Sequence, residues 1–134
     1  MSATTTITTA LRNALADLID TTINAGTTDA SGDFQILDDP SALVTIPLNN
    51  PSHGAASGGV ITLDTTGGLE AAASGTGTAD IGRFRDRDNT EVIRGNADVA
   101  AGTPAVTLTN TSINSGQTCR ITSGTITIPA SVTV

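Results

Sequence analysis

Residues 34–48 read FQILDDPSALVTIPL, which predicts two short β-strands joined by a turn. The first strand covers 34–37 and ends at the Asp-Asp-Pro sequence, whose residues favour turns. The second strand covers 43–48 and places Val44, Ile46 and Leu48 on one face, since successive side chains of a strand alternate. Pro47 has no amide proton to donate, so this strand should end there or lie at the edge of its sheet.

Similar short segments, separated by turn residues, continue to the end of the chain. The expected strands are 60–64, 69–77, 78–85, 90–94, 105–109, 118–122, 125–128 and 131–134. We expect 78–85 and 90–94 to form a hairpin, and 96–103 to form a loop. Turn signals recur about every 8–12 residues, which is typical of sandwiches and jelly rolls. The sequence therefore predicts a mainly β fold: a β-sandwich or jelly-roll-like domain of about eight short antiparallel strands.

Residues 10–23 have helical spacing instead. Apolar or small side chains recur there at intervals of three and four residues, which predicts one N-terminal amphipathic helix. The members of this stripe are Leu11, Ala14, Leu15, Leu18, Ile19 and Thr22. Asn13, Asp17 and Asp20 share the opposite face, which we expect to be exposed to water.

The first nine residues are polar and rich in threonine. They predict a flexible N-terminal arm, 1–9, followed by a single β-sandwich domain, 10–134, that includes the helix. Within the arm, Thr4, Thr5, Thr6 and Ile7 could form a strand that adds to the sheet of a neighbouring molecule. The residues 131–134 could do the same.

The composition limits the classes of function. Aromatic residues make up 1% of the 134 residues, so stacking platforms for single-stranded nucleic acid or for sugar rings are scarce. A net charge of −7 repels phosphate backbones, so we expect no nucleic-acid partner. One Cys and one His provide neither an internal disulfide nor a Cys/His metal site, and we expect no cofactor. The sequence has no export signal and no apolar run of roughly 18 residues, so we expect no membrane association.

Three groups of residues could carry chemistry, and each also has a structural interpretation. His53, with the many serines and aspartates, could form a Ser-His-Asp arrangement, but a surface-loop histidine is the favoured interpretation. Asp86, Asp88, Asn89 and Glu91 have the alternating oxygens that a cation prefers, yet no glycine stands at the sixth position of such a loop. A charged hairpin tip is therefore the favoured interpretation. A second acidic stretch could also bind a cation, but a solvated loop is the favoured interpretation. Its members are Asp29, Asp33, Asp38 and Asp39.

A fourth group is the arginine strip, Arg83, Arg85 and Arg87. On an acidic protein these residues could dock on an acidic partner surface through bidentate pairing. They could equally pair with the chain's own Asp86, Asp88 and Glu91. The sequence leaves both interpretations open.

Three segments together resemble a known class of protein: LRNALAD at 11–17, LNNPSHGAASGGV at 48–60 and LTNTSINSGQ at 108–117. They look like small β-rich virion structural proteins of tailed bacteriophages, of the capsid decoration or cement type. The resemblance implies a non-enzymatic protein on the capsid surface of the virion, made in the host cytoplasm. Its implied partners are the major capsid protein and copies of itself, as a dimer or trimer, with no small-molecule substrate. The alternative is a tail-associated receptor- or glycan-binding module.

Overall fold

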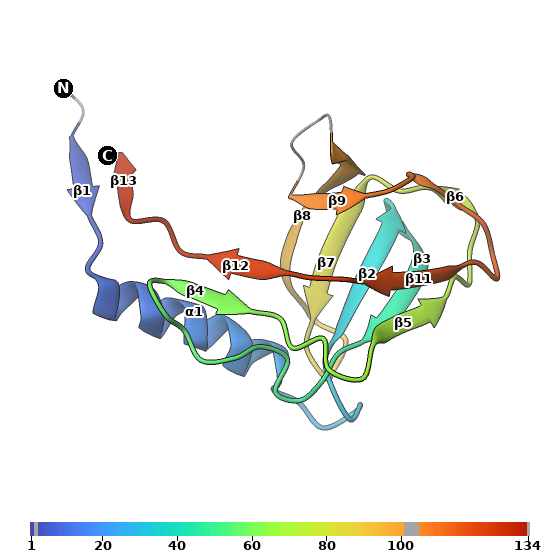
Figure 1. Ribbon diagram of the computed structural model, residues 1–134, viewed down its shortest axis with the longest axis horizontal. Helices are drawn as coiled ribbons and strands as arrows, with labels where there is room; N and C mark the ends of the chain where they lie inside the picture. Colours follow the sequence, from blue (N-terminus) through green and yellow to red (C-terminus); the bar gives the residue numbers. More distant parts are fainter. Residues whose placement is uncertain (2, 101–104, 134) are drawn as a thin grey trace.

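The computed structural model describes residues 1, 3–100 and 105–133. It is mainly β with one N-terminal helix, which confirms the expected fold class (Figure 1). The elements in chain order are β1 (Thr4–Thr6), α1 (Thr9–Ile23), β2 (Asp33–Asp38), β3 (Ser41–Pro47), β4 (Val60–Thr62), β5 (Leu69–Ala72), β6 (Gly77–Thr78), β7 (Ile81–Arg85), β8 (Glu91–Val99), β9 (Val106–Leu108), β10 (Ser112–Ile113), β11 (Thr118–Ile121), β12 (Thr125–Thr127) and β13 (Ser131–Thr133).

The first layer of the fold is a five-stranded sheet in the order β3-β2-β7-β8-β9. As expected, Pro47 is the last residue of β3, and β3 is an edge strand. The hairpin of β7 and β8 is also confirmed, with Asn89 in its turn at a φ of 67°. Two expectations are wrong: β8 and β9 are parallel, and β8 continues through 96–99, where we expected a loop. The residues 101–103 of that expected loop lie outside the described residues.

The second layer is a long two-stranded ribbon. Its strands β4, β5 and β6 run antiparallel to β12, β11 and β10 respectively. Backbone hydrogen bonds continue the pairing between these strands, from Leu63 N to Gly124 O (2.9 Å) and from Ala73 N to Gln117 O (2.7 Å). Figure 1 shows β11 and β12 crossing in front of the first sheet, so the two layers form a sandwich-like fold.

The core lies where the two layers and the end of α1 meet. It consists of aliphatic side chains and one aromatic ring, as a composition poor in aromatics requires. The buried members are Ile23, Phe34, Ile36, Leu43, Val44, Ile46, Leu48, Leu63, Leu69, Ala73, Ala79 and Ile113. Burying one large aliphatic side chain contributes about 1.5–3 kcal/mol, so this cluster is the main source of stability.

The two ends of the chain pair with each other outside this core. β1 and β13 form an antiparallel ribbon in which Thr5 lies opposite Val132, and all six of its residues are exposed. Ile7 N donates to Ala130 O at 2.8 Å and extends the ladder. Figure 1 shows this ribbon beyond the N-terminal end of α1, away from the five-stranded sheet. Residues 4–7 of the predicted arm are therefore paired with the chain's own C-terminal segment.

Helix α1 begins one residue earlier than expected and ends where expected. Thr8 caps its first turn, because the Thr8 side chain accepts from Leu11 N at 3.3 Å. The expected orientation of the helix is wrong. Ala16 and Ile23 are its buried residues, whereas Leu11, Leu15 and Leu18 are exposed. The face that we expected to meet water is the one that contacts the body of the protein.

Candidate functional site

His53, which the sequence marked as a possible catalytic residue, lies under α1 beside Ser52 and Asp20. Asp20 Oδ1 accepts hydrogen bonds from Ser52 Oγ at 2.8 Å and from the backbone N–H of His53 at 2.9 Å. Ser52 Oγ lies 2.8 Å from His53 Nδ1. Ser52 is fully buried and His53 is 3% exposed, so the expectation of a surface-loop histidine is wrong.

The bonding of these three residues differs from that of an activated serine. In a nucleophilic triad the serine and the aspartate contact opposite ring nitrogens of the histidine. Here Ser52 Oγ and Asp20 Oδ1 both lie beside Nδ1, at 2.8 and 3.5 Å. The single hydroxyl proton of Ser52 goes to Asp20, so Nδ1 carries the ring proton and donates it to Ser52 Oγ. The arrangement joins the loop 49–59 to α1 and leaves no hydroxyl free to attack a substrate.

The other ring nitrogen of His53 is buried without a hydrogen-bond partner among the described residues. The ring packs against Phe84, with the centroids 5.6 Å apart. Burial lowers the pKa of His53 below its ordinary value of about 6.5, and nearby Asp20 only partly opposes this effect. The physical reason is that burial removes the water that would stabilise the charged ring.

The lowered pKa of His53 predicts a loss of stability in mild acid. The unfolded chain takes up the proton near pH 6.5 and the folded chain takes it up at a lower pH, so the free energy of unfolding should fall as the pH drops below about 6.5. Urea unfolding at about pH 7.5 and about pH 5.5 measures this fall. His53→Gln should show a smaller fall than the wild type, and equal falls in the two proteins would contradict the prediction.

The polar face of α1 binds the same loop at two further points, and it binds the segment after β12 at a third. Asn13 Oδ1 accepts from Gly59 N at 2.7 Å, and Asp17 Oδ1 accepts from Ala56 N at 2.8 Å. Arg12 Nε donates to Ile128 O at 3.0 Å. These side chains satisfy backbone groups that a loop cannot satisfy by itself, so the polar residues of the helix face inward.

The arginine strip is paired within the molecule. Arg85 forms a bidentate ion pair with Asp33, at 2.8 and 2.6 Å. Arg83 donates to Gln35 Oε1 at 3.0 and 2.7 Å and forms an ion pair with Glu91 at 3.3 Å. The Nε of Arg87 donates to the backbone oxygen of Asp29 at 2.6 Å. Of the partners that the sequence suggested, only Glu91 contacts one of these guanidinium groups by an ion pair or hydrogen bond in the described structure.

The acidic residues of the hairpin tip accept hydrogen bonds from the backbone. Asp86 Oδ1 accepts from the N–H groups of Asp88 and Thr90, and Asp88 Oδ1 accepts from those of Thr27 and Thr28. The hydrogen bond from Thr27 N is the main cause of a lowered pKa of Asp88. Among the described residues, no three His, Cys, Asp or Glu side chains are grouped so that they could hold a metal ion. No helix in the described part of the chain is long and apolar enough to cross a membrane.

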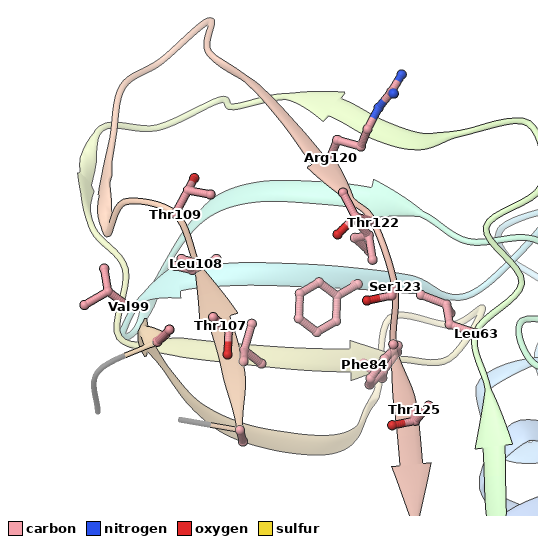
Figure 2. Close-up of a pocket in the computed structure, with 16 residues that line it drawn as sticks. Leu63, Phe84, Val99, Thr107, Leu108, Thr109, Arg120, Thr122, Ser123 and Thr125 are labelled. Carbon is pink, nitrogen blue, oxygen red and sulfur yellow. The ribbon is translucent and has the colours of Figure 1, made fainter. Parts of the chain in front are cut away.

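A groove of about 910 Å³ lies between β9 and the segment through β11 and β12. Figure 2 shows Thr107, Leu108 and Thr109 on one side and Thr122, Ser123 and Thr125 on the other. Phe34 and Phe84 also line it, so the groove combines apolar surface with hydroxyl groups. Sequence reasoning missed this groove because its two walls come from strands that are not paired with each other.

Comparison with known proteins identifies no relative of this chain. No family model matches the sequence, and no curated protein or solved structure matches it. Inferences about function therefore depend on the geometry of the chain and on the resemblance in its sequence.

Proposed function

We propose that this chain is a structural virion protein of a tailed bacteriophage that decorates and stabilises the capsid shell. It acts as a cement protein on the capsid surface, through self-association and through docking on the major capsid protein. Catalysis, nucleic acid and membranes have no part in this proposal. The observation that carries it is the exposed β1–β13 ribbon, together with the resemblance of the sequence to such virion proteins.

The ribbon has little to stabilise it within one molecule. A two-stranded ribbon alone in water is at best marginally stable, and neither β1 nor β13 contributes a buried side chain. Each strand of the ribbon also has an outer edge that pairs with no other strand of the described structure. An extended segment or a sheet edge of a neighbouring protein could pair with either edge through backbone hydrogen bonds.

The distribution of charge along the chain also favours docking at the β1–β13 ribbon. The net charge is −7, which keeps free copies soluble before they dock. The paired strands β1 and β13 consist of Thr, Ser and Val and contain no charged residue. A second surface can therefore approach the ribbon without meeting a like charge there.

Shell binding tests this function directly. We expect the wild-type chain to bind shells of its phage at a high, fixed copy number, and Thr5→Asp to bind at least about tenfold more weakly because it places a charge on the ribbon edge. Thr118→Asp is the matched control, since it places the same charge at an exposed position of β11 in the body of the protein. A handful of copies per virion, or equal binding by Thr5→Asp, would contradict the proposal.

The groove favours the second candidate function, a tail-associated receptor- or glycan-binding module. Hydroxyl groups beside the Phe34 and Phe84 rings could contact the polar and apolar faces of a sugar. A reproducible hit on a glycan array, absent in Phe84→Ala, would rank this function above the capsid role.

A further inference from the structure

His53 is the single histidine of the chain, and its ring is closed off beneath α1. Its Nε2 is buried without a hydrogen-bond partner among the described residues. Polar atoms buried in this way are rare in proteins and raise the free energy of the folded state. The other nitrogen, Nδ1, lies 2.8 Å from Ser52 Oγ, and that hydroxyl donates to Asp20 of the helix at 2.8 Å. The ring is therefore part of the contact between α1 and the loop 49–59.

Helix α1 is attached to the rest of the protein largely by polar contacts. Its buried residues are Ala16 and Ile23, whereas its three leucines are exposed. The other contacts are hydrogen bonds from backbone and side-chain groups of the loop to polar side chains of the helix and its C-cap, such as that from Ser52 N to Asn24 Oδ1 at 3.0 Å. Lifting the helix off would expose two buried apolar side chains, so it should require less free energy than unfolding the two-layer core.

The charged group that acts on the His53 ring belongs to α1. Asp20 Oδ1 lies 3.5 Å from Nδ1, and its negative charge favours the protonated ring. Burial outweighs this attraction and lowers the pKa of His53. Asp17, one turn earlier in the helix, is hydrogen-bonded to Ala56 N instead. The folded state therefore resists a second ring proton even though a carboxylate lies beside the ring.

The other elements packed around the ring direct their charged groups elsewhere in the described structure. The ring packs against Phe84 of β7, and the flanking Arg83 and Arg85 are bonded to side chains of β2. His53 also forms a β-bridge with Leu63, and the carboxylate of the next residue, Asp64, accepts a hydrogen bond from a backbone N–H of its own turn. Protonation of the ring therefore depends on whether water can reach it.

We propose that protonation of His53 releases α1 from the loop 49–59, as a local opening that leaves the two-layer core folded. The second proton adds at Nε2, where the described structure offers no acceptor, and the opening lets water solvate it. β1 leads into α1 through residues 7 and 8, so the opening also frees the β1–β13 ribbon to move relative to the body. The release is a property of the free chain and does not depend on the proposed function.

Proton linkage limits the size of the effect. Between pH 7 and pH 5 His53 is the side chain whose ordinary pKa lies in the range, because carboxylates titrate near pH 4. With an ordinary pKa of about 6.5 for the ring in the open state, the equilibrium constant for opening can rise at most about 25-fold between pH 7 and pH 5. Proton uptake by the closed state reduces the rise below this limit.

Amide hydrogen exchange of the full chain measures the opening residue by residue. The N–H groups of Ser52 and His53 donate to side chains of α1 and its cap, so their exchange reports release of the helix. We expect their protection factors to fall by about 3-fold to 25-fold from pH 7 to pH 5, and to lie at least about tenfold below that of Ile36 in the central strand β2. The control is the N–H of Asp86 in the hairpin tip, whose protection factor should not change with pH.

His53→Gln removes the titrating group, so the protection factor of the Ser52 amide should become independent of pH. A nuclear magnetic resonance titration of the single histidine ring in the wild type provides a second measurement in case this variant does not fold, and it should give a pKa below 6.5. Equal protection of the Ser52 and Ile36 amides would overturn the proposal, because His53 would then reach water only by global unfolding. Protection factors of Ser52 and His53 that stay constant between pH 7 and pH 5, equal falls in the wild type and His53→Gln, or a ring pKa of 6.5 or higher would also overturn it.

Discussion

Replacing Arg85 with alanine should lower the free energy of unfolding by about 3 kcal/mol, which corresponds to a fall of about 10 °C in the melting temperature. Arg85 joins β7 to β2 through two hydrogen bonds to Asp33, and the two side chains are 15% and 11% exposed. The hydrogen bond to Asp33 is also the main cause of a raised pKa of Arg85. The variant leaves the Asp33 carboxylate buried without its counter-charge, and this residual penalty dominates the loss.

The chain contains a matched control for this substitution. Arg120 and Glu70 form an ion pair of 2.7 Å between β11 and β5, but their side chains are 60% and 46% exposed. Removing Glu70 should cost less than about 1 kcal/mol, because water solvates the arginine that remains. Chemical denaturation of Arg85→Ala and Glu70→Ala measures the difference. Similar losses in the two variants would mean that burial does not determine the strength of these pairs.

Replacing Asp20 with alanine should have an effect of similar size, about 3 kcal/mol. Its Oδ1 accepts from Ser52 Oγ, from His53 N and from Asn24 Nδ2. Ser52 and His53 are buried, so their donors would lose an acceptor that water cannot replace. Thermal unfolding monitored by circular dichroism gives the loss.

Asp17→Ala on the same helix is the control for Asp20→Ala. Asp17 is exposed and accepts one backbone hydrogen bond, from Ala56 N. Its replacement should cost about 1 kcal/mol or less, because water can reach the freed N–H group. Equal losses in the two variants would contradict the view that Asp20 anchors the loop 49–59 to the helix.

Local patterns predicted most of the elements of this fold. The predicted strands 34–37 and 43–48 correspond to β2 and β3, and Pro47 correctly indicated an edge. The helix was predicted from the spacing of its apolar residues. These features depend on residues within a few positions of one another, so they can be read without knowing the rest of the chain.

The candidate sites were less predictable. His53 has polar and small neighbours in sequence, yet it is buried, because Asp20 and Ser52 hold its loop against α1. The orientation of α1 was predicted wrongly for the same reason. A hydrophobic stripe normally faces the core, but here the backbone N–H groups of loop 49–59 require the polar side of the helix.

Short-range periodicity and composition are enough to specify the kinds of element, their approximate bounds and an aliphatic core. Long-range contacts in the folded chain specify that β4 to β6 pair with β10 to β12, that Arg85 pairs with Asp33, and which face of α1 remains exposed. The physical reason is that each of these outcomes depends on hydrogen-bond partners and charges contributed by residues far apart in the chain, and no local pattern encodes which of them will meet.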